Sequence, residues 1–453
     1  MGILLCFAAF LAGMLLCLAL SWPIAWALGA GLVLFSAVGL RRGYRLRELA
    51  GMAWGKMPKT MIVLRILFLI GLLTGLWRSS GTIAFFIYYG LRVITPKLFV
   101  LVAFLLAALL SYALGTSFGV ASTAGVVLMA LARSGGVNPA VAAGAILSGV
   151  YFGDRGAPTS SCASLVAALT ETELYSNVKR MFKTALPAYA ICLIFYLVLS
   201  FRNPVTTVDE TLLGALAEQF RLSVWTLLPA VVMLVLPLVH VPIRITMLIS
   251  GALALVLTLA LQHIGIGEAL RICVFGYQPT NELLTGVLTG GGLRSMLASF
   301  IMLPLASFLT GVLEGTGVLD GMQERLTALA ERIGRLPTAT LLSILASMTL
   351  CNQTVVIMMT HQLIGKVYER SGAQHEELAM DIANSGVTIA GLVPWCIACS
   401  VPLSMMDVGT EALPYAALLY TIPLCYLLTK RFYFPEGGRS HDGKDPKAEA
   451  NRG

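Results

Sequence analysis

Long apolar runs follow one another along almost the whole chain, and they constrain its fold more than any other feature. Of the 453 residues, 57% are hydrophobic and only 12% are charged. A water-soluble domain carries about twice that fraction of charged residues. A chain of this length therefore has too little polar surface to cover a soluble particle, and we interpret it as a membrane protein.

The runs have the length that membrane helices need, since about 20 residues of helix span the hydrocarbon core of a bilayer. They occupy residues 3–20, 23–40, 61–77, 98–114, 117–132, 138–152, 184–200, 224–241, 245–262, 298–313, 338–350, 353–367, 386–404 and 412–429. Some runs are too short or too polar to cross alone. We therefore predict an all-α polytopic protein in the lipid bilayer, with roughly 10–13 transmembrane helices.

The basic residues lie in the connections between apolar runs. Those between the second and third runs are Arg41, Arg42, Arg45, Arg47, Lys56 and Lys59. Short loops rich in Lys and Arg stay in the cytoplasm, so we expect both termini on the cytoplasmic side of the plasma (inner) membrane. The charged stretch from Lys430 onward is interpreted as a disordered tail. The net charge of +8 thus indicates membrane orientation, and no nucleic-acid partner is expected.

The sequence resembles itself at an offset of 236 residues. The matching positions are Thr74-Gly75 with Thr310-Gly311, Ser80-Gly81 with Thr316-Gly317, Gly115-Thr116-Ser117 with Cys351-Asn352-Gln353, Pro158 with Pro394 and, with one residue of slip, Ser134-Gly135 with Ser371-Gly372 and Ser148-Gly149-Val150 with Ser385-Gly386-Val387. Each match is weak alone, but their order and nearly constant offset predict an internal repeat.

The repeat divides the chain into five parts. We predict a two-span hairpin with a basic loop (1–59), a first transport repeat (60–200), connector spans (201–296), a second transport repeat (297–430) and a charged tail (431–453). Apolar segments that are broken at matching places in two halves are the best sequence indication of a transporter's binding site.

The stretch GVYFGDRGAPTSSCASLV (149–166) is such a break in the first half. Its glycines and Pro158 interrupt the helix, and non-helical backbone survives in a membrane only where it lines a cavity or is buried in protein. Asp154 supplies a negative charge that Arg155 would balance, and a charge in this setting is usually functional. Oxygen atoms come from Thr159, Ser160 and Ser161. The alternative is that Asp154 and Arg155 lie in a loop at the membrane surface.

The second half offers neutral oxygen donors beside its own breaks. They are Asn352, Gln353, Asn384, Ser385 and Thr388. Hard cations such as sodium prefer such oxygens together with at least one carboxylate. Alternatively, the amides hold helices together. We expect no cofactor and no tight metal site. The sequence has no histidine cluster and no nucleotide-binding motif, and the pair Cys396-x-x-Cys399, although it has a redox spacing, lies in an apolar run where cysteines pack as small apolar residues.

Two further charges occupy equivalent repeat positions, Arg78 and Glu314. If the repeats are inverted, the two side chains would approach each other near the centre, and Glu314 would carry a coupling proton. The alternatives are a fixed ion pair or two side chains that reach toward opposite faces of the membrane.

These motifs together resemble the NhaC family of sodium/proton antiporters, part of the broader ion transporter superfamily. The resemblance covers residues from about 60 to 430 and is carried by GLWRSSGT (75–82), IYYGLRVITPKLF (87–99), GTSFG (115–119), the stretch around Asp154, ELYSNVKRMFKTALPA (173–188), GVLEGTGVLD (311–320) and NSGVTIAGLVPW (384–395).

The resemblance implies secondary antiport driven by ion gradients, and two inverted repeats whose broken helices meet near the membrane midplane. Since many relatives in the superfamily are dimers, it also makes a homodimer an open expectation. By position, Asp154 matches the family's aspartate after glycine, and Thr116 and Ser117 match its GTS. Ser160 matches the serine of its SDTT block, and Glu314 matches a second-half glutamate.

The chain departs from the family where charge is concerned. Ser161 replaces the aspartate of SDTT, and Asn384 occupies a position where the second-half block usually carries acid, with Asp381 slightly displaced. Arg78 is also unusual in its block. The site has therefore lost negative charge, which weakens plain sodium/proton exchange and favours an organic anion or zwitterion whose carboxylate would lie near Arg78 or Arg155.

Three functions remain from this reasoning, of which a channel is the least favoured because it would not need two matched broken repeats. The first is an antiporter that exchanges sodium or another monovalent cation for protons by alternating access, with Asp154 binding both. The second is an ion-coupled exchanger of a small organic anion or amino acid on the same fold. An enzyme is not expected, since no nucleophile–base pair or metal-ligand spacing supports one.

Overall fold

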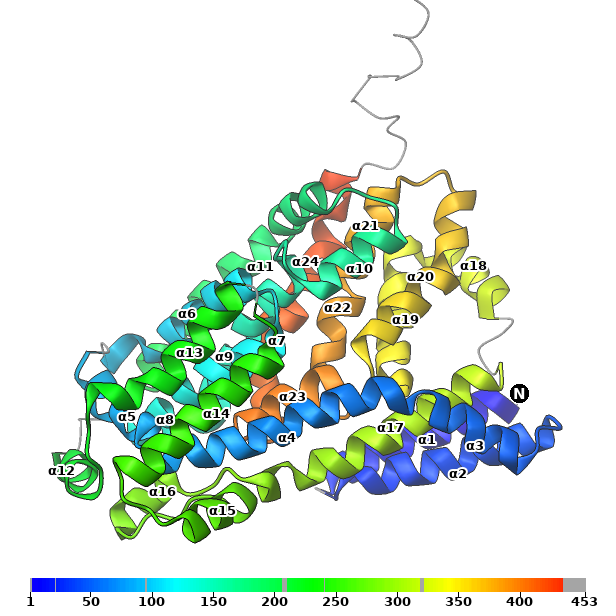
Figure 1. Cartoon of the computed structure of the whole chain (residues 1–453). Coiled ribbons are helices and arrows are strands. Elements are labelled where there is room, and N and C mark those ends of the chain that lie inside the picture. Colours follow the sequence, from blue (N-terminus) through cyan, green and yellow to red (C-terminus); the bar gives the residue numbers. More distant parts are fainter. Residues whose placement is uncertain are drawn as a thin grey trace, which may run out of the picture.

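The computed structural model describes residues 2–20, 22–93, 96–205, 210–239, 241–317 and 322–434, and this part of the chain is almost entirely helical (Figure 1). Within it, β pairing is limited to an isolated antiparallel bridge between Tyr277 and Gly290. The predicted tail (431–453) lies outside the described residues from position 435 onward.

The helices before and within the first predicted repeat are α1 (Gly2–Ala19), α2 (Ile24–Arg41), α3 (Leu46–Gly55), α4 (Met57–Ser79), α5 (Thr82–Val93), α6 (Phe99–Leu114), α7 (Ser117–Val120), α8 (Val126–Ser134), α9 (Pro139–Gly156), α10 (Ser161–Leu169) and α11 (Leu174–Arg202). The connector contains α12 (Glu210–Gln219), α13 (Leu228–Leu238), α14 (Ile243–Ala260), α15 (Ile266–Phe275) and α16 (Thr285–Leu288).

The second predicted repeat contains α17 (Leu297–Gly315), α18 (Met322–Ile333), α19 (Arg335–Leu350), α20 (Gln353–Arg370), α21 (His375–Asn384), α22 (Gly386–Ile389), α23 (Ile397–Met405) and α24 (Ala417–Tyr433). Short 3₁₀ turns lie at Pro96–Leu98, Val224–Leu227, Glu282–Leu284, Leu293–Met296, Ala390–Leu392 and Thr410–Tyr415, and a π turn lies at Ala121–Gly125.

Several of these helices are long and apolar enough to cross a membrane. Within the described residues, five qualify alone: Ile24–Arg41, Thr60–Ser79, Ser117–Ser134, Leu174–Arg202 and Leu293–Gly315. Two bent pairs qualify together, Leu213–Gln219 with Val224–Pro237 and His375–Leu392 with Ile397–Met405. The predicted all-α polytopic membrane architecture is confirmed, while the number of crossings stays a prediction.

The backbone recurs at the offset of 236 residues that the sequence suggested. Residues with a left-handed backbone conformation occur at equivalent positions of the two repeats: Gly81 and Gly317, Gly115 and Cys351, Gly136 and Gly372, and Glu171 and Asp407. Helix bounds recur as well: α6 and α19 end at 114 and 350, α9 and α21 begin at 139 and 375, and α10 and α23 begin at 161 and 397. Because the starts of α9 and α21 are 236 apart, the predicted one-residue slip is wrong, and Ser148 corresponds to Asn384.

Equivalent helices α4 and α17 lie side by side and run in opposite directions (Figure 1). Lys56, just before α4, pairs with Glu314 in the last turn of α17, whereas Gly71 in the second half of α4 contacts Leu293, just before α17. Antiparallel packing of equivalent helices is what an inverted repeat produces.

The close crossing of helices α6 and α9 holds the first break, which follows Asp154 and Arg155, in position. Helices α6 and α9 meet at Gly149 and Gly153, where a Cβ on Gly153 would lie 2.0 Å from the main-chain carbon of Ser111. Small residues allow backbones to approach this closely in membrane helices. The last turn of α9, which carries Asp154 and Arg155, is thereby held in the interior. The surface-loop alternative for these two residues is excluded.

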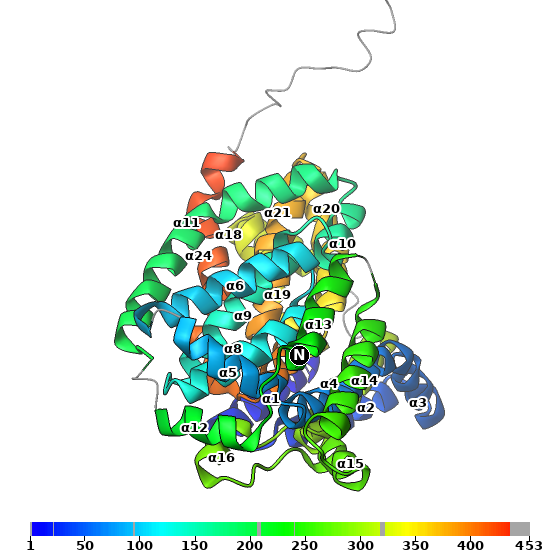
Figure 2. The same ribbon diagram turned by 60° about the vertical axis from the view of Figure 1, so that its left-hand side comes forward.

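The two ends of the molecule are formed by different helices. Figures 1 and 2 place the connector helices α12, α15 and α16 at the end opposite to α21 and to the end of α24. The prediction that disorder begins at Lys430 is wrong, because Lys430 lies in the last turn of α24. Its ammonium group pairs with the carboxylates of Glu377 and Asp381, which keeps this turn helical.

Candidate ion- and substrate-binding site

The first break separates α9 from α10. After Asp154 and Arg155 the chain becomes extended at Ala157, and α10 starts after its N-cap, Ser160. The Ser160 hydroxyl accepts from the amides of Cys162 and Ala163 at 3.1 and 3.3 Å and donates to the main-chain carbonyl of Asp154. Ser160 therefore shapes the break and is already satisfied by backbone.

The Asp154 carboxylate is buried in this break, with only 5% of the residue exposed. Its Oδ2 lies 3.4 Å from Nε2 of Gln353 and 3.7 Å from Sγ of Cys162. The amide and hydroxyl of Ser117 face the same carboxylate as donors. Among the ion pairs of the described residues, none includes Asp154 or Arg155. The expectation that Arg155 balances Asp154 is thus wrong.

Equivalent breaks precede α7 and α20. Gly115 and Cys351 are left-handed, and Thr116 and Asn352 are the extended N-caps that follow them. The Thr116 hydroxyl accepts from the Gly119 amide at 3.3 Å. Asn352 Oδ1 accepts from the amides at 354 and 355 at 3.0 and 3.4 Å. Both polar side chains stabilise helix starts, as their residue types favour.

The two breaks of the first repeat touch each other. Gly115 packs directly on Thr159, whose Oγ1 would lie 2.3 Å from a Cβ at position 115. A glycine is therefore required here both for its left-handed backbone and for the close approach. In the second repeat, the amide of Ile397 donates to the Cys351 carbonyl at 2.9 Å, which joins the corresponding pair of breaks.

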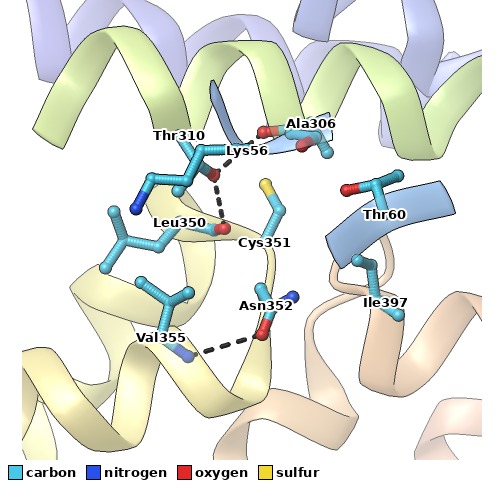
Figure 3. A pocket seen from close by; sticks show the side chains of 10 residues that line it. Lys56, Thr60, Ala306, Thr310, Leu350, Cys351, Asn352, Val355 and Ile397 are labelled. Carbon is cyan, nitrogen blue, oxygen red and sulfur yellow. Dashed lines mark hydrogen bonds between the residues drawn. The ribbon is translucent and has the colours of Figure 1, made fainter. Parts of the chain in front are cut away.

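A small pocket lies beside the break at Cys351 and Asn352 (Figure 3). Lys56, Thr310 and Ile397 also line it. The Thr310 hydroxyl donates to the Leu350 carbonyl at 2.6 Å. Because Lys56 brings positive charge to this pocket and the side-chain oxygens of Thr310 and Asn352 are bonded to backbone, the pocket is a poorer cation site than the surroundings of Asp154.

Gln353 connects the two halves at their centre. Its Nε2 donates to the Val387 carbonyl at 2.9 Å and faces Asp154 Oδ2. Val387 follows the point where α21 ends and α22 begins, at Ser385. In the first repeat α9 continues without interruption through the corresponding Gly149. The two repeats therefore differ in conformation at this position.

The other polar residues predicted in the second half are engaged within their surroundings. The Ser385 hydroxyl donates to the Asp381 carbonyl at 2.5 Å and lies 3.2 Å from Ser343 Oγ. The Thr388 hydroxyl donates to the carbonyls of Asn384 and Ser385 at 3.3 and 3.2 Å. These two hydroxyls therefore form hydrogen bonds with the backbone carbonyls around the break in the helix.

Arg155 is fully buried with neutral partners only. Its guanidinium donates to the hydroxyl of Tyr189 at 3.2 Å, to the carbonyl of Met181 at 3.0 Å and to Oδ1 of Asn384. Its Nε has no partner. A buried cation without a counter-charge is costly, which sets this guanidinium apart from the paired charges of the described residues.

Arg78 and Glu314 do not approach each other, and that expectation is wrong. Arg78 is buried in the last turn of α4, where it donates to the Thr74 carbonyl at 3.1 Å beside Gly291. Glu314 is bound to Lys56, just before the first turn of the same helix. The length of α4 separates the two charges by about 33 Å at 1.5 Å per residue.

The structure thus sorts the predicted residues. It brings together Asp154, Ser117 and Gln353, and it joins Arg155 to Asn384. It leaves Ser161 exposed at the start of α10. Sequence reasoning missed the thiol of Cys162 beside Asp154, although the spacing of eight residues across a break was the available signal.

Comparisons with known proteins identify the family of this chain. Residues 149–429 match the model of the Na+/H+ antiporter family. The chain is 29% identical over 83% of its length to the malate-2H(+)/Na(+)-lactate antiporter of Bacillus subtilis, of which it covers 82%. It is 28% identical over 80% of its length to the Na(+)/H(+) antiporter NhaC of Alkalihalophilus pseudofirmus, and it covers 80% of that protein.

A third relative is named for a different substrate. The arginine/ornithine antiporter ArcD of Halobacterium salinarum is 28% identical over 73% of this chain and is covered over 70% of its own length. These relatives are antiporters, and the family model spans more than half of the chain, including Asp154 and Gln353. The chain belongs to the Na+/H+ antiporter family.

Proposed function

We propose that this protein exchanges sodium, or another monovalent cation, for protons by alternating access, and that Asp154 binds both ions in turn. The observation that carries the proposal is the buried Asp154 carboxylate, which has donors but no basic partner and lies between breaks of both repeats. A carboxylate of this kind can be neutralised either by a proton or by a cation.

The surrounding atoms fit a cation as the second ligand. Sodium prefers oxygen, and the carboxylate, the Ser117 hydroxyl and the freed carbonyls of the breaks supply it. The Gln353 amide donates toward Asp154 when no cation is bound. Turning that amide by half a rotation would present its oxygen to a bound cation and would release the Val387 carbonyl.

That rotation offers a link between ion binding and conformation. Gln353 holds the carbonyl of Val387, which lies just beyond the break in α21. The corresponding stretch of α9 is unbroken. We infer that the opposite-facing state exchanges these two conformations between the repeats, which is how an inverted repeat generates alternating access.

The test is transport by purified protein in proteoliposomes that contain a pH-sensitive dye and an imposed proton gradient. Addition of sodium or lithium is expected to dissipate the gradient, and Asp154→Asn is expected to abolish this response. Thr170→Ala, at the far end of α10, is the control. If the wild type responds and Asp154→Asn responds equally, Asp154 is not the ion-binding group.

A second candidate is the ion-coupled exchange of a small organic anion or amino acid. It is favoured by Arg155, whose buried guanidinium has neutral partners and an unpaired Nε. Arginine is well suited to bind a carboxylate through two parallel hydrogen bonds. The malate/lactate and arginine/ornithine antiporters among the relatives are compatible with this substrate class.

The same vesicles distinguish the two candidates. A panel of carboxylates and amino acids would be added in the presence and absence of sodium. For organic-anion exchange, Arg155→Gln should abolish the response to the carboxylate, and Arg155→Lys should retain part of it. A response to sodium alone, unchanged in Arg155→Gln, would exclude the second candidate.

We also propose the location and orientation that the charge pattern predicts. The protein would lie in the plasma (inner) membrane with both termini in the cytoplasm, since the basic residues around α3 form a short loop. Cysteine-accessibility labelling at Arg47→Cys in intact cells and inverted vesicles tests this directly. Cross-linking in the membrane would test for a homodimer.

A further inference from the structure

A second buried carboxylate, Asp381, lies outside the surroundings of Asp154. It is fully buried in α21, three residues before Asn384, where that helix ends. Three groups donate to its carboxylate: the hydroxyls of Tyr368 and Tyr426 and the ammonium of Lys430. Ionisable residues at such depth in a membrane protein are rare and are usually functional.

The arrangement around Lys430 allows this carboxylate to lose its charge. The Lys430 ammonium lies 2.6 Å from Oε1 of Glu377 and also contacts Asp381. Oε1 of Glu377 also lies 2.9 Å from Nη2 of Arg335. If Asp381 took up a proton, Lys430 would keep Glu377 as its partner, so no buried charge would be left unpaired. A fixed ion pair would lack this second acceptor.

The exposed fraction of the charged side chains falls from the surface toward Asp381. The side chains of Arg335 and Lys430 are 25% and 13% exposed, whereas those of Glu377 and Asp381 are 6% and 0% exposed. Besides desolvation, the groups that act on the Asp381 carboxylate are Lys430, Tyr368 and Glu377. Of the elements packed against α21, α10 and α22 carry no charged residue, and Arg180 of α11 pairs with Glu376.

On its inner side, Asp381 is connected to the ion site. Asn384, one turn further along α21, accepts from Arg155, the residue that follows Asp154. Beyond the break, the Val387 carbonyl accepts a hydrogen bond from Gln353, whose side chain faces the Asp154 carboxylate. A change of charge on Asp381 would act on the helix whose broken end supports the ion site.

From this geometry we propose that Asp381 is a second proton-carrying residue of the transport cycle, loaded through Lys430 from the face where α24 ends. This inference rests on the proposed cation/proton exchange. The proton passes from Nζ of Lys430 to Oδ2 of Asp381, so one N–H bond breaks and one O–H bond forms. The resulting amine regains a proton from water at its exposed side, and the reverse sequence releases the proton.

The test separates proton movement from cation movement. Sodium-driven proton flux requires both ions, whereas the exchange of radioactive sodium for sodium across the same vesicle membrane requires no proton. Asp381→Asn is expected to lower proton flux about a hundred-fold, the scale of a lost proton-transfer group, while sodium/sodium exchange continues at the wild-type rate. Glu376→Gln is the matched control, because it removes a neighbouring carboxylate of the same helix that pairs with Arg180 and lies outside the proton path, so it should retain both activities.

Other outcomes lead to definite conclusions. If Asp381→Asn lowers both activities together, or neither, Asp381 is structural and the inference is overturned. If the wild type exchanges no sodium at all, the proposed function itself fails. Should Asp381→Asn not fold, Lys430→Gln replaces it: the loss of the group that passes the proton to Asp381 should lower proton flux while sodium/sodium exchange continues, whereas unchanged proton flux overturns the inference.

Discussion

The side-chain nitrogen of Gln353 lies 3.4 Å from Oδ2 of Asp154, and the same nitrogen is bonded to the Val387 carbonyl. One amide therefore bridges the carboxylate of the first repeat and the broken helix of the second. In the proposed transport cycle, this contact connects the ion site directly to the broken helix.

Removal of this bridge should weaken cation binding without abolishing it. Gln353→Ala is expected to raise the apparent KM for sodium about five-fold, since a hydrogen bond contributes about 1 kcal/mol. The measurement is dye recovery in proteoliposomes over a range of sodium concentrations. Gln374→Ala, at an exposed position whose side chain makes no capping bond, is the control. An unchanged KM in Gln353→Ala would show that the amide does not contribute to the ion site.

The crossing of α6 and α9 offers a matched pair of glycines. Gly153→Ala should prevent stable folding or cost about 1–3 kcal/mol or more, because its Cβ would lie 2.0 Å from the main chain at Ser111. Gly156→Ala, three residues later, has open space around its Cβ and should be tolerated. Size-exclusion chromatography and thermal unfolding of the detergent-solubilised proteins compare the two. Equal stability of both variants would contradict the close crossing.

Much of this architecture could be predicted from sequence because it depends on local patterns. Glycine, proline and polar interruptions of apolar runs locate the breaks at Thr116 and Asn352, and their common offset reveals the repeat. The slip of one residue arose from matching residue types, whereas the backbone follows the left-handed positions.

Contacts between distant segments could not be predicted in the same way. Nothing in the local pattern pairs Lys430 with Asp381 or Lys56 with Glu314. The expected approach of Arg78 and Glu314 assumed that equivalent positions meet at the centre. Because α4 and α17 pack antiparallel along their lengths, these positions lie at opposite ends instead.

Glu314 is accordingly a poor candidate for a coupling proton. Its side chain is 21% exposed and paired with Lys56, and pairs of this kind contribute about 0–1 kcal/mol. Glu314→Gln should therefore leave sodium-driven proton flux close to that of the wild type, with at most a small loss of thermal stability. Lys56→Gln should behave alike. Loss of proton flux in Glu314→Gln with normal sodium/sodium exchange would restore the proton-carrying role to this residue.

Competition between a proton and a cation for Asp154 predicts a characteristic pH dependence. When the carboxylate is protonated, sodium must displace the proton, so the apparent KM should fall about tenfold for each unit of rising pH until the site is ionised. In Asp154→Asn, both this dependence and the transport itself should disappear. The measurement is the initial rate of radioactive sodium uptake at a series of pH values equal on both sides of the vesicle membrane. A KM that is independent of pH, together with a normal maximal rate, would mean that proton and cation occupy separate groups, and would shift the coupling from Asp154 to Asp381.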